Sequence, residues 1–101
     1  MKVFISQPMK DLTNEQIKSN RDKVVKDLTT QGYEIIDSVF DYEDVEGLKN
    51  KPLFYLSKSL ELMAKEADIV CFMRDWSEAK GCVLEYSCAV AYNIPILYEP
   101  C

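Results

Sequence analysis

The 101-residue sequence contains no histidine, and this absence narrows the chemistry open to it. Nucleophilic catalysis by a Ser-His or Cys-His pair is excluded, because the activating imidazole is missing. The four cysteines have no CxxC spacing, so we expect neither a metal site nor a cofactor. Acid–base chemistry must then use carboxylates, lysines, tyrosines or thiols.

Long apolar runs and clusters of positive charge are also lacking. No stretch approaches the ~20 apolar residues of a membrane span, and the apolar start at residues 1–5 is too short for a signal peptide. We therefore expect a cytoplasmic protein with reduced cysteines and no membrane partner. The net charge of −5, without a run of Lys or Arg, argues against a nucleic acid polymer as partner. A small anionic ligand remains possible, because a local pocket can be positive on an acidic protein.

Short apolar runs alternate with helical patterns, which predicts one α/β domain over residues 1–101. A doubly wound, mostly parallel sheet of four to five strands is expected, with helices on both faces in a flavodoxin-like or Rossmann-like three-layer fold. The run at 68–73 is almost continuously apolar, which is typical of a central strand. The expected strands are 2–6, 33–36, 68–73 and 95–98, and the expected helices are 14–31, 52–67 and 82–92.

Two segments between these elements carry further signals. Thr13 and Gln16 form a capping-box pattern at the start of the first helix, and Gly32 is suited to end it. The acidic segment 37–51 predicts a long loop, which is either functional or a solvated surface loop.

Ligands of open parallel sheets bind outside the carboxyl ends of the strands. That rule selects 6–10, 37–38 and 74–81, together with the first turn of each following helix. Glu85 is expected in the first turn of the third helix, where the helix dipole would keep it ionised. An ionised carboxylate can attack an acetal-like carbon. The alternative is that Glu85 is there only because the dipole favours acidic residues in any first turn.

The segment 81–96 resembles the signature of the nucleoside 2-deoxyribosyltransferase superfamily, with Gly81 in a loop, Glu85 at a helix start, then small residues and a short strand. The segments 3–9 and 66–70 resemble its first strand with the ligand-facing loop and its central-strand entry. The chain is similar above all to small members of this superfamily from phages and prophages.

The resemblance implies that Glu85 attacks C1′ of a nucleoside or nucleoside 5′-monophosphate, giving a retained glycosyl-enzyme intermediate. It also implies a homo-oligomer, since many relatives complete their sites with a neighbouring subunit. The substrate-binding residues expected on this basis are Ser6, Gln7, Pro8, Met9, Asp37, Ser59, Asp75, Trp76 and Gly81.

The sequence also departs from the superfamily pattern. The expected aspartate of the second helix falls near Leu60, with Ser59 adjacent, and another expected acidic or hydroxyl residue falls on Ala79. Neither position supplies an acid for the leaving base. A non-catalytic nucleotide-binding module therefore stays open, as does an assembly protein driven by its tyrosine-rich helices. Trp76 is either a base-stacking residue or a cap on the core.

Overall fold

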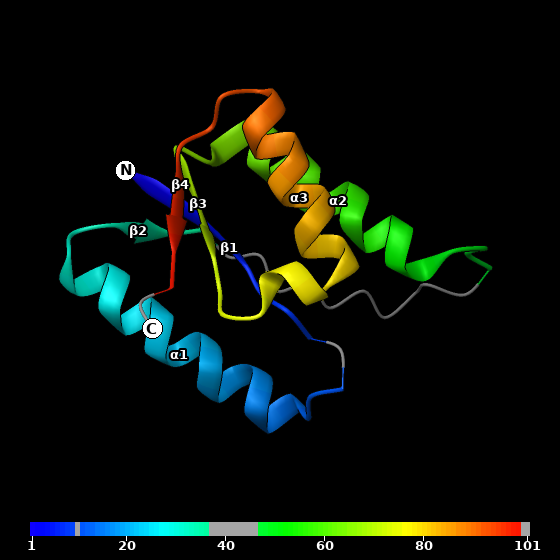
Figure 1. Cartoon of the computed structure of the whole chain (residues 1–101), viewed down its shortest axis with the longest axis horizontal. Coiled ribbons are helices and arrows are strands. Elements are labelled where there is room, and N and C mark those ends of the chain that lie inside the picture. The colour runs from blue at the N-terminus through cyan, green and yellow to red at the C-terminus, as the bar shows by residue number, and fades with distance from the viewer. Residues whose placement is uncertain (10, 37–46, 100–101) are drawn as a thin grey trace.

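The computed structural model describes residues 1–9, 11–36 and 47–99. Its four strands form one sheet in which every neighbouring pair is parallel, in the order β2-β1-β3-β4 (Figure 1). This confirms the predicted α/β class and is consistent with a flavodoxin-like three-layer fold. The strands are β1 (Lys2–Ser6), β2 (Glu34–Ile35), β3 (Ile69–Phe72) and β4 (Ile96–Tyr98).

Three α-helices cover the two faces of the sheet. The helix α1 (Asn14–Thr30) lies on one face, and α2 (Lys51–Glu66) lies beside α3 (Lys80–Ala91) on the other (Figure 1). A single 3₁₀ turn, η1 (Trp76–Glu78), joins β3 to α3. No helix in the described part of the chain is both long and apolar enough to cross a bilayer.

Local signals explain where α1 begins and ends. The Thr13 hydroxyl accepts a hydrogen bond from the Gln16 backbone N–H at 3.1 Å, and Gln16 Oε1 accepts one from the Thr13 N–H at 2.9 Å. The predicted capping box is therefore confirmed. Gly32 follows the helix with φ of +94°, a conformation that glycine adopts at little cost.

The pleat of the strands divides the core into two layers. Val3 and Ile5 pack with Val24 and Leu28 on the α1 face, whereas Phe4 packs with the α2 and α3 side. All four residues of β3 are buried, because this strand lies between β1 and β4 and has helices over both faces. This explains the continuous apolar run that predicted a central strand.

The sheet reverses its winding direction between β1 and β3. The chain leaves β1 toward α1 on one face and leaves β3 toward α3 on the other (Figure 1). Ser6, the last residue of β1, is in register with Phe72, the last of β3. The connections that follow therefore diverge from neighbouring strand ends, which is where ligands of doubly wound sheets bind.

Removing the cap at the start of α1 should destabilise the protein measurably. We expect Thr13→Ala to lower the free energy of unfolding by about 1 kcal/mol, because the Gln16 N–H loses its acceptor. Urea titration followed by circular dichroism measures this change. Thr29→Ala, an exposed position near the other end of α1, is the matched control and should change stability by less. Equal effects of the two substitutions would contradict the capping role.

Candidate functional site

Glu85 lies on the inner side of α3, with only 7% of its surface exposed. Its Oε1 accepts a hydrogen bond of 3.1 Å from the hydroxyl of Ser6. Ser6 is itself almost fully buried, and it follows Phe4 by two residues on the same face of β1. A carboxyl group is therefore held against the end of β1, beside the point where the sheet reverses its winding.

The ionisation expected for Glu85 is wrong. Burial, partly offset by the hydrogen bond from Ser6, raises the pKa of Glu85 to about 7. The helix begins at Lys80, two residues earlier than expected, so Glu85 lies in its second turn. The field of a helix dipole falls off within the first turn, and desolvation therefore dominates.

Cys82 borders the same pair, one turn before Glu85 on the buried side of α3. Burial raises the pKa of the Cys82 thiol to about 11, opposed by its hydrogen bond to Ser6 and assisted by the negative charge of Glu85. A thiol that stays protonated is a poor nucleophile, so Cys82 is a structural residue of this buried face.

Trp76 packs against three other aromatic residues, Phe72, Tyr86 and Tyr98. Its ring stacks on Tyr86 with centroids 4.5 Å apart and lies 5.2 Å from Phe72. The ring of Tyr98 is 6.3 Å away. Of the two interpretations of Trp76, the core cap describes this packing, in which the indole lies against Phe72 and Tyr86 on the α3 side of the core.

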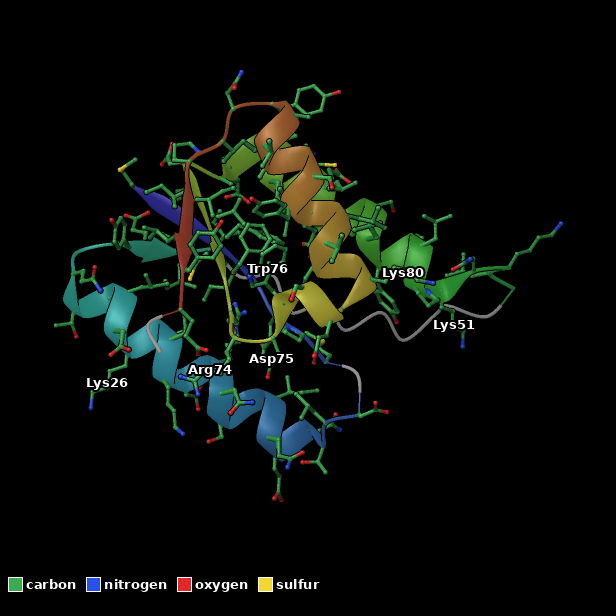
Figure 2. The ribbon with its side chains drawn as sticks, in the orientation of Figure 1. Lys26, Lys51, Arg74, Asp75, Trp76 and Lys80 are labelled. Carbon is green, nitrogen blue, oxygen red and sulfur yellow. The ribbon has the colours of Figure 1, made fainter. Side chains whose placement is uncertain are left out.

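A separate cavity of about 560 Å³ opens on the α1 side of the same sheet edge. Pro8 and Met73 line it together with Asp75, which has φ of +67°. Arg74 and Asp75 lie toward α1, whereas Trp76 lies between β4 and α3 (Figure 2). The lining has five carboxylates against two cations, Lys23 and Arg74, so this cavity disfavours a phosphate.

The predicted site residues are therefore divided between two sides of the sheet. Ser6 meets Glu85 on the α3 side, whereas Pro8 and Asp75 line the α1-side cavity. Gln7 belongs to the α1 side as well, since its Nε2 donates to the Ile17 carbonyl at 2.7 Å while its Oε1 is buried without a partner. Met9 is exposed.

The other predicted residues have different positions. Gly81 is in the first turn of α3 rather than in a loop, and there is open space on the side where a side chain would project. Ser59 lies half-buried in α2, one turn before the buried Met63. Asp37 lies outside the described residues.

One contributor to the strand-end region was not predicted. Glu99 follows β4, and its Oε2 accepts a 2.9 Å hydrogen bond from the backbone N–H of Arg74 in the turn after β3. The rule that selected the other strand ends also selects this position, because Glu99 comes directly after the last strand. In the described part of the chain, no group of three or more Cys, Asp or Glu side chains is placed to hold a metal ion.

The raised pKa of Glu85 predicts how stability depends on pH. The carboxyl titrates at its ordinary value of 4.5 when unfolded and at about 7 when folded. Between these two pH values the folded state binds more protons than the unfolded state. The free energy that the protonated carboxyl contributes to stability is therefore fully present below pH 4.5 and is lost as the pH rises through 7. Glu85→Gln removes this titration while resembling the protonated acid.

We expect the stability advantage of Glu85→Gln over wild type to grow by about 2–3 kcal/mol between pH 4.5 and pH 8. Denaturant titrations of both proteins at four pH values measure it. Glu66→Gln, at an exposed ion pair with Lys2, is the control and should show no comparable growth. A constant difference for Glu85→Gln would mean that this carboxyl is not the buried titrating group.

Comparison with known proteins gives one match to a family and no match to a curated protein. The matching family is described as "Domain of unknown function (DUF4406)", and its model covers residues 1–98. The match includes every strand and helix described above, and both Ser6 and Glu85. The chain therefore belongs to the DUF4406 family.

Proposed function

We propose that the protein is a cytoplasmic enzyme that cleaves or transfers the N-glycosidic bond of a (deoxy)nucleoside or nucleoside 5′-monophosphate, with Glu85 as the nucleophile. The observation that carries this proposal is the buried hydrogen bond from Ser6 to Glu85 beside the β1/β3 crossover. The resemblance to the nucleoside 2-deoxyribosyltransferase superfamily supplies the substrate class.

The chemistry needs an ionised Glu85 at the moment of attack. One carboxylate oxygen bonds to C1′ of the sugar as the C–N bond breaks, and the base leaves with the bonding electron pair and takes up a proton. Water or a second base then attacks C1′ and releases Glu85, so two inversions give retention. The hydroxyl of Ser6 fixes Oε1 and opposes the rise in the pKa of Glu85, which keeps part of the carboxyl ionised near neutral pH.

The start of α3 suits a phosphate better than the α1-side cavity does. Its first turn has no acidic residue and no side-chain cap, so the backbone N–H groups that precede Val83, whose own N–H donates to the Ala79 carbonyl, can face an anion. Lys80 adds a positive charge at this end, and Gly81 leaves room for close approach (Figure 2). These features support a monophosphate substrate whose phosphate lies over the start of α3.

The leaving base has no evident acid among the described residues. Both α2 and α3 run antiparallel to the strands, and Met63 shares a core cluster with Ala89. Ser59 and Glu85 each lie one turn before these residues, toward the carboxyl edge of the sheet. Ser59 therefore lies as near to the carboxyl edge of the sheet as Glu85 does, at the position where a carboxylic acid would face the substrate. This favours, as a second candidate, a nucleotide-binding module without turnover.

Base release distinguishes the two candidates. We expect wild type to liberate free base from at least one member of a panel of nucleosides, deoxynucleosides and their 5′-monophosphates, as measured by chromatography. Glu85→Ala should lower the rate by at least ~10³-fold, because the nucleophile is removed. Glu66→Gln, on an exposed carboxylate at the far end of α2, should retain the wild-type rate.

The same panel is followed by thermal shift. Stabilisation of wild type by a ligand without base release would contradict the enzyme and support the binding module. Absence of both signals would contradict the nucleoside substrate class.

Ser6 acts on the reaction through Glu85, so its replacement should change the pH profile. Ser6→Ala removes the hydrogen bond that lowers the pKa of Glu85. A hydrogen bond to a charged group is worth about 1.5–3 kcal/mol, so the acidic limb of kcat/KM should move up by about one to two pH units. Ser19→Ala, on the exposed side of α1, is the control. A lower rate with an unshifted limb would indicate a merely structural role for Ser6.

A further inference from the structure

Cys82 is a buried group beside the Ser6–Glu85 pair, and the proposed chemistry leaves it without a part. The exposed fraction is 3% for Cys82 and 1% for Ser6. Cys82 and Glu85 are three positions apart on the buried side of α3, so their side chains are neighbours along the helix. The hydroxyl of Ser6, on β1, is hydrogen-bonded to both of them. The three side chains therefore form a buried polar cluster between the sheet and α3.

The hydroxyl of Ser6 has a single proton, so it cannot donate to both neighbours at once. Glu85, with a pKa of about 7, ionises well before Cys82, whose pKa is about 11. A charged acceptor attracts a donor most strongly, so the proton of Ser6 points to Oε1 of the ionised Glu85. The contact with Cys82 then has the opposite direction: the thiol keeps its proton and donates to a lone pair of the Ser6 oxygen.

The result is a directed chain in which Cys82 donates to Ser6 and Ser6 donates to Glu85. Hydrogen bonds that follow one another in this way strengthen each other by about 10–30%. The strengthening is greatest when Glu85 is ionised, because the chain then ends on a negative charge. The thiol therefore stabilises the ionised carboxylate through Ser6.

The surroundings of Glu85 in the described part of the chain leave Cys82 as the titratable group to consider. Burial and the hydrogen bond from Ser6 are the causes of the pKa of Glu85. On this side β1 and β3 contribute Ser6 and the apolar Phe4 and Phe72. Titratable and charged residues on the adjoining helical segments are exposed or have other partners: Tyr86, Lys58, Glu61, Lys65, Glu78 and Lys80.

We propose that Cys82 is a positioning residue of this site, whose thiol orients the Ser6 hydroxyl toward Oε1 and thereby favours the ionised form of Glu85. Cys82 itself stays protonated and takes no part in making or breaking bonds. In the reaction its contact increases the fraction of the protein that is ready for attack, and this consequence rests on the proposed function. The effect of Cys82 on the ionisation of Glu85 is measured without a substrate.

NMR titration between about pH 4.5 and pH 9 tests this effect on the side-chain carboxyl carbon of Glu85, whose signal Glu85→Gln identifies. Cys82→Ala removes the donor, whereas Cys82→Ser has nearly the size of alanine and keeps a donor. We expect the pKa of Glu85 to be about 0.1–0.7 of a pH unit higher in Cys82→Ala than in Cys82→Ser. Cys88→Ala and Cys88→Ser, at a half-buried position of the same helix, are the matched controls and should titrate alike. An equal or lower pKa in Cys82→Ala overturns the proposal.

Replacing Ser6 tests whether the effect passes through its hydroxyl. In a Ser6→Ala background the two Cys82 variants should give the same pKa for Glu85, because the link between them is missing. An undiminished difference would mean that position 82 acts on Glu85 directly, and it would overturn the positioning role. Circular dichroism checks that each variant is folded. A protein that releases no base contradicts the proposed function and leaves these titrations unchanged.

Discussion

A single buried hydrogen bond, from the hydroxyl of Ser6 to Oε1 of Glu85, joins the first strand to the last helix across 79 positions of sequence. Both residues lie on the side of the sheet where Phe4, Val70 and Phe72 form an apolar layer. A buried polar group without a partner costs about 1–3 kcal/mol, so each of the two depends on the other. The position of β1 and the rotation of α3 about its axis are therefore fixed together.

This constraint has a chemical consequence for the carboxyl group. The same burial that makes the pair interdependent raises the pKa of Glu85 to about 7, and the hydroxyl of Ser6 opposes that rise. The thiol of Cys82, one turn earlier, remains protonated in the same surroundings because its pKa is raised to about 11. In the described site, Glu85 thus changes its charge close to neutral pH. The fraction of Glu85 that is ionised depends on how tightly the surrounding residues bury it.

The fold could be predicted because its signals are local. The capping box of Thr13 and Gln16, Gly32 after α1 and the apolar run of β3 each specify an element within a few residues. The site was only partly predictable, because it depends on contacts between distant elements. The strand-end rule selected Ser6 and the turn holding Asp75, and the structure places both at the carboxyl ends of strands. The charge of Glu85 and the division of the site by the sheet depend on where α3 begins and on which helix covers which face.

The stacking of Trp76 on Tyr86 gives the protein an internal optical reporter. Trp76 is the only tryptophan of the chain, and Tyr86 directly follows Glu85 in α3. The indole emission therefore comes from one location, where its colour and intensity depend on the distance to the phenol ring and on nearby charge. A change in α3 or in the ionisation of Glu85 takes place within reach of this fluorophore, so the site can be observed without attaching a label.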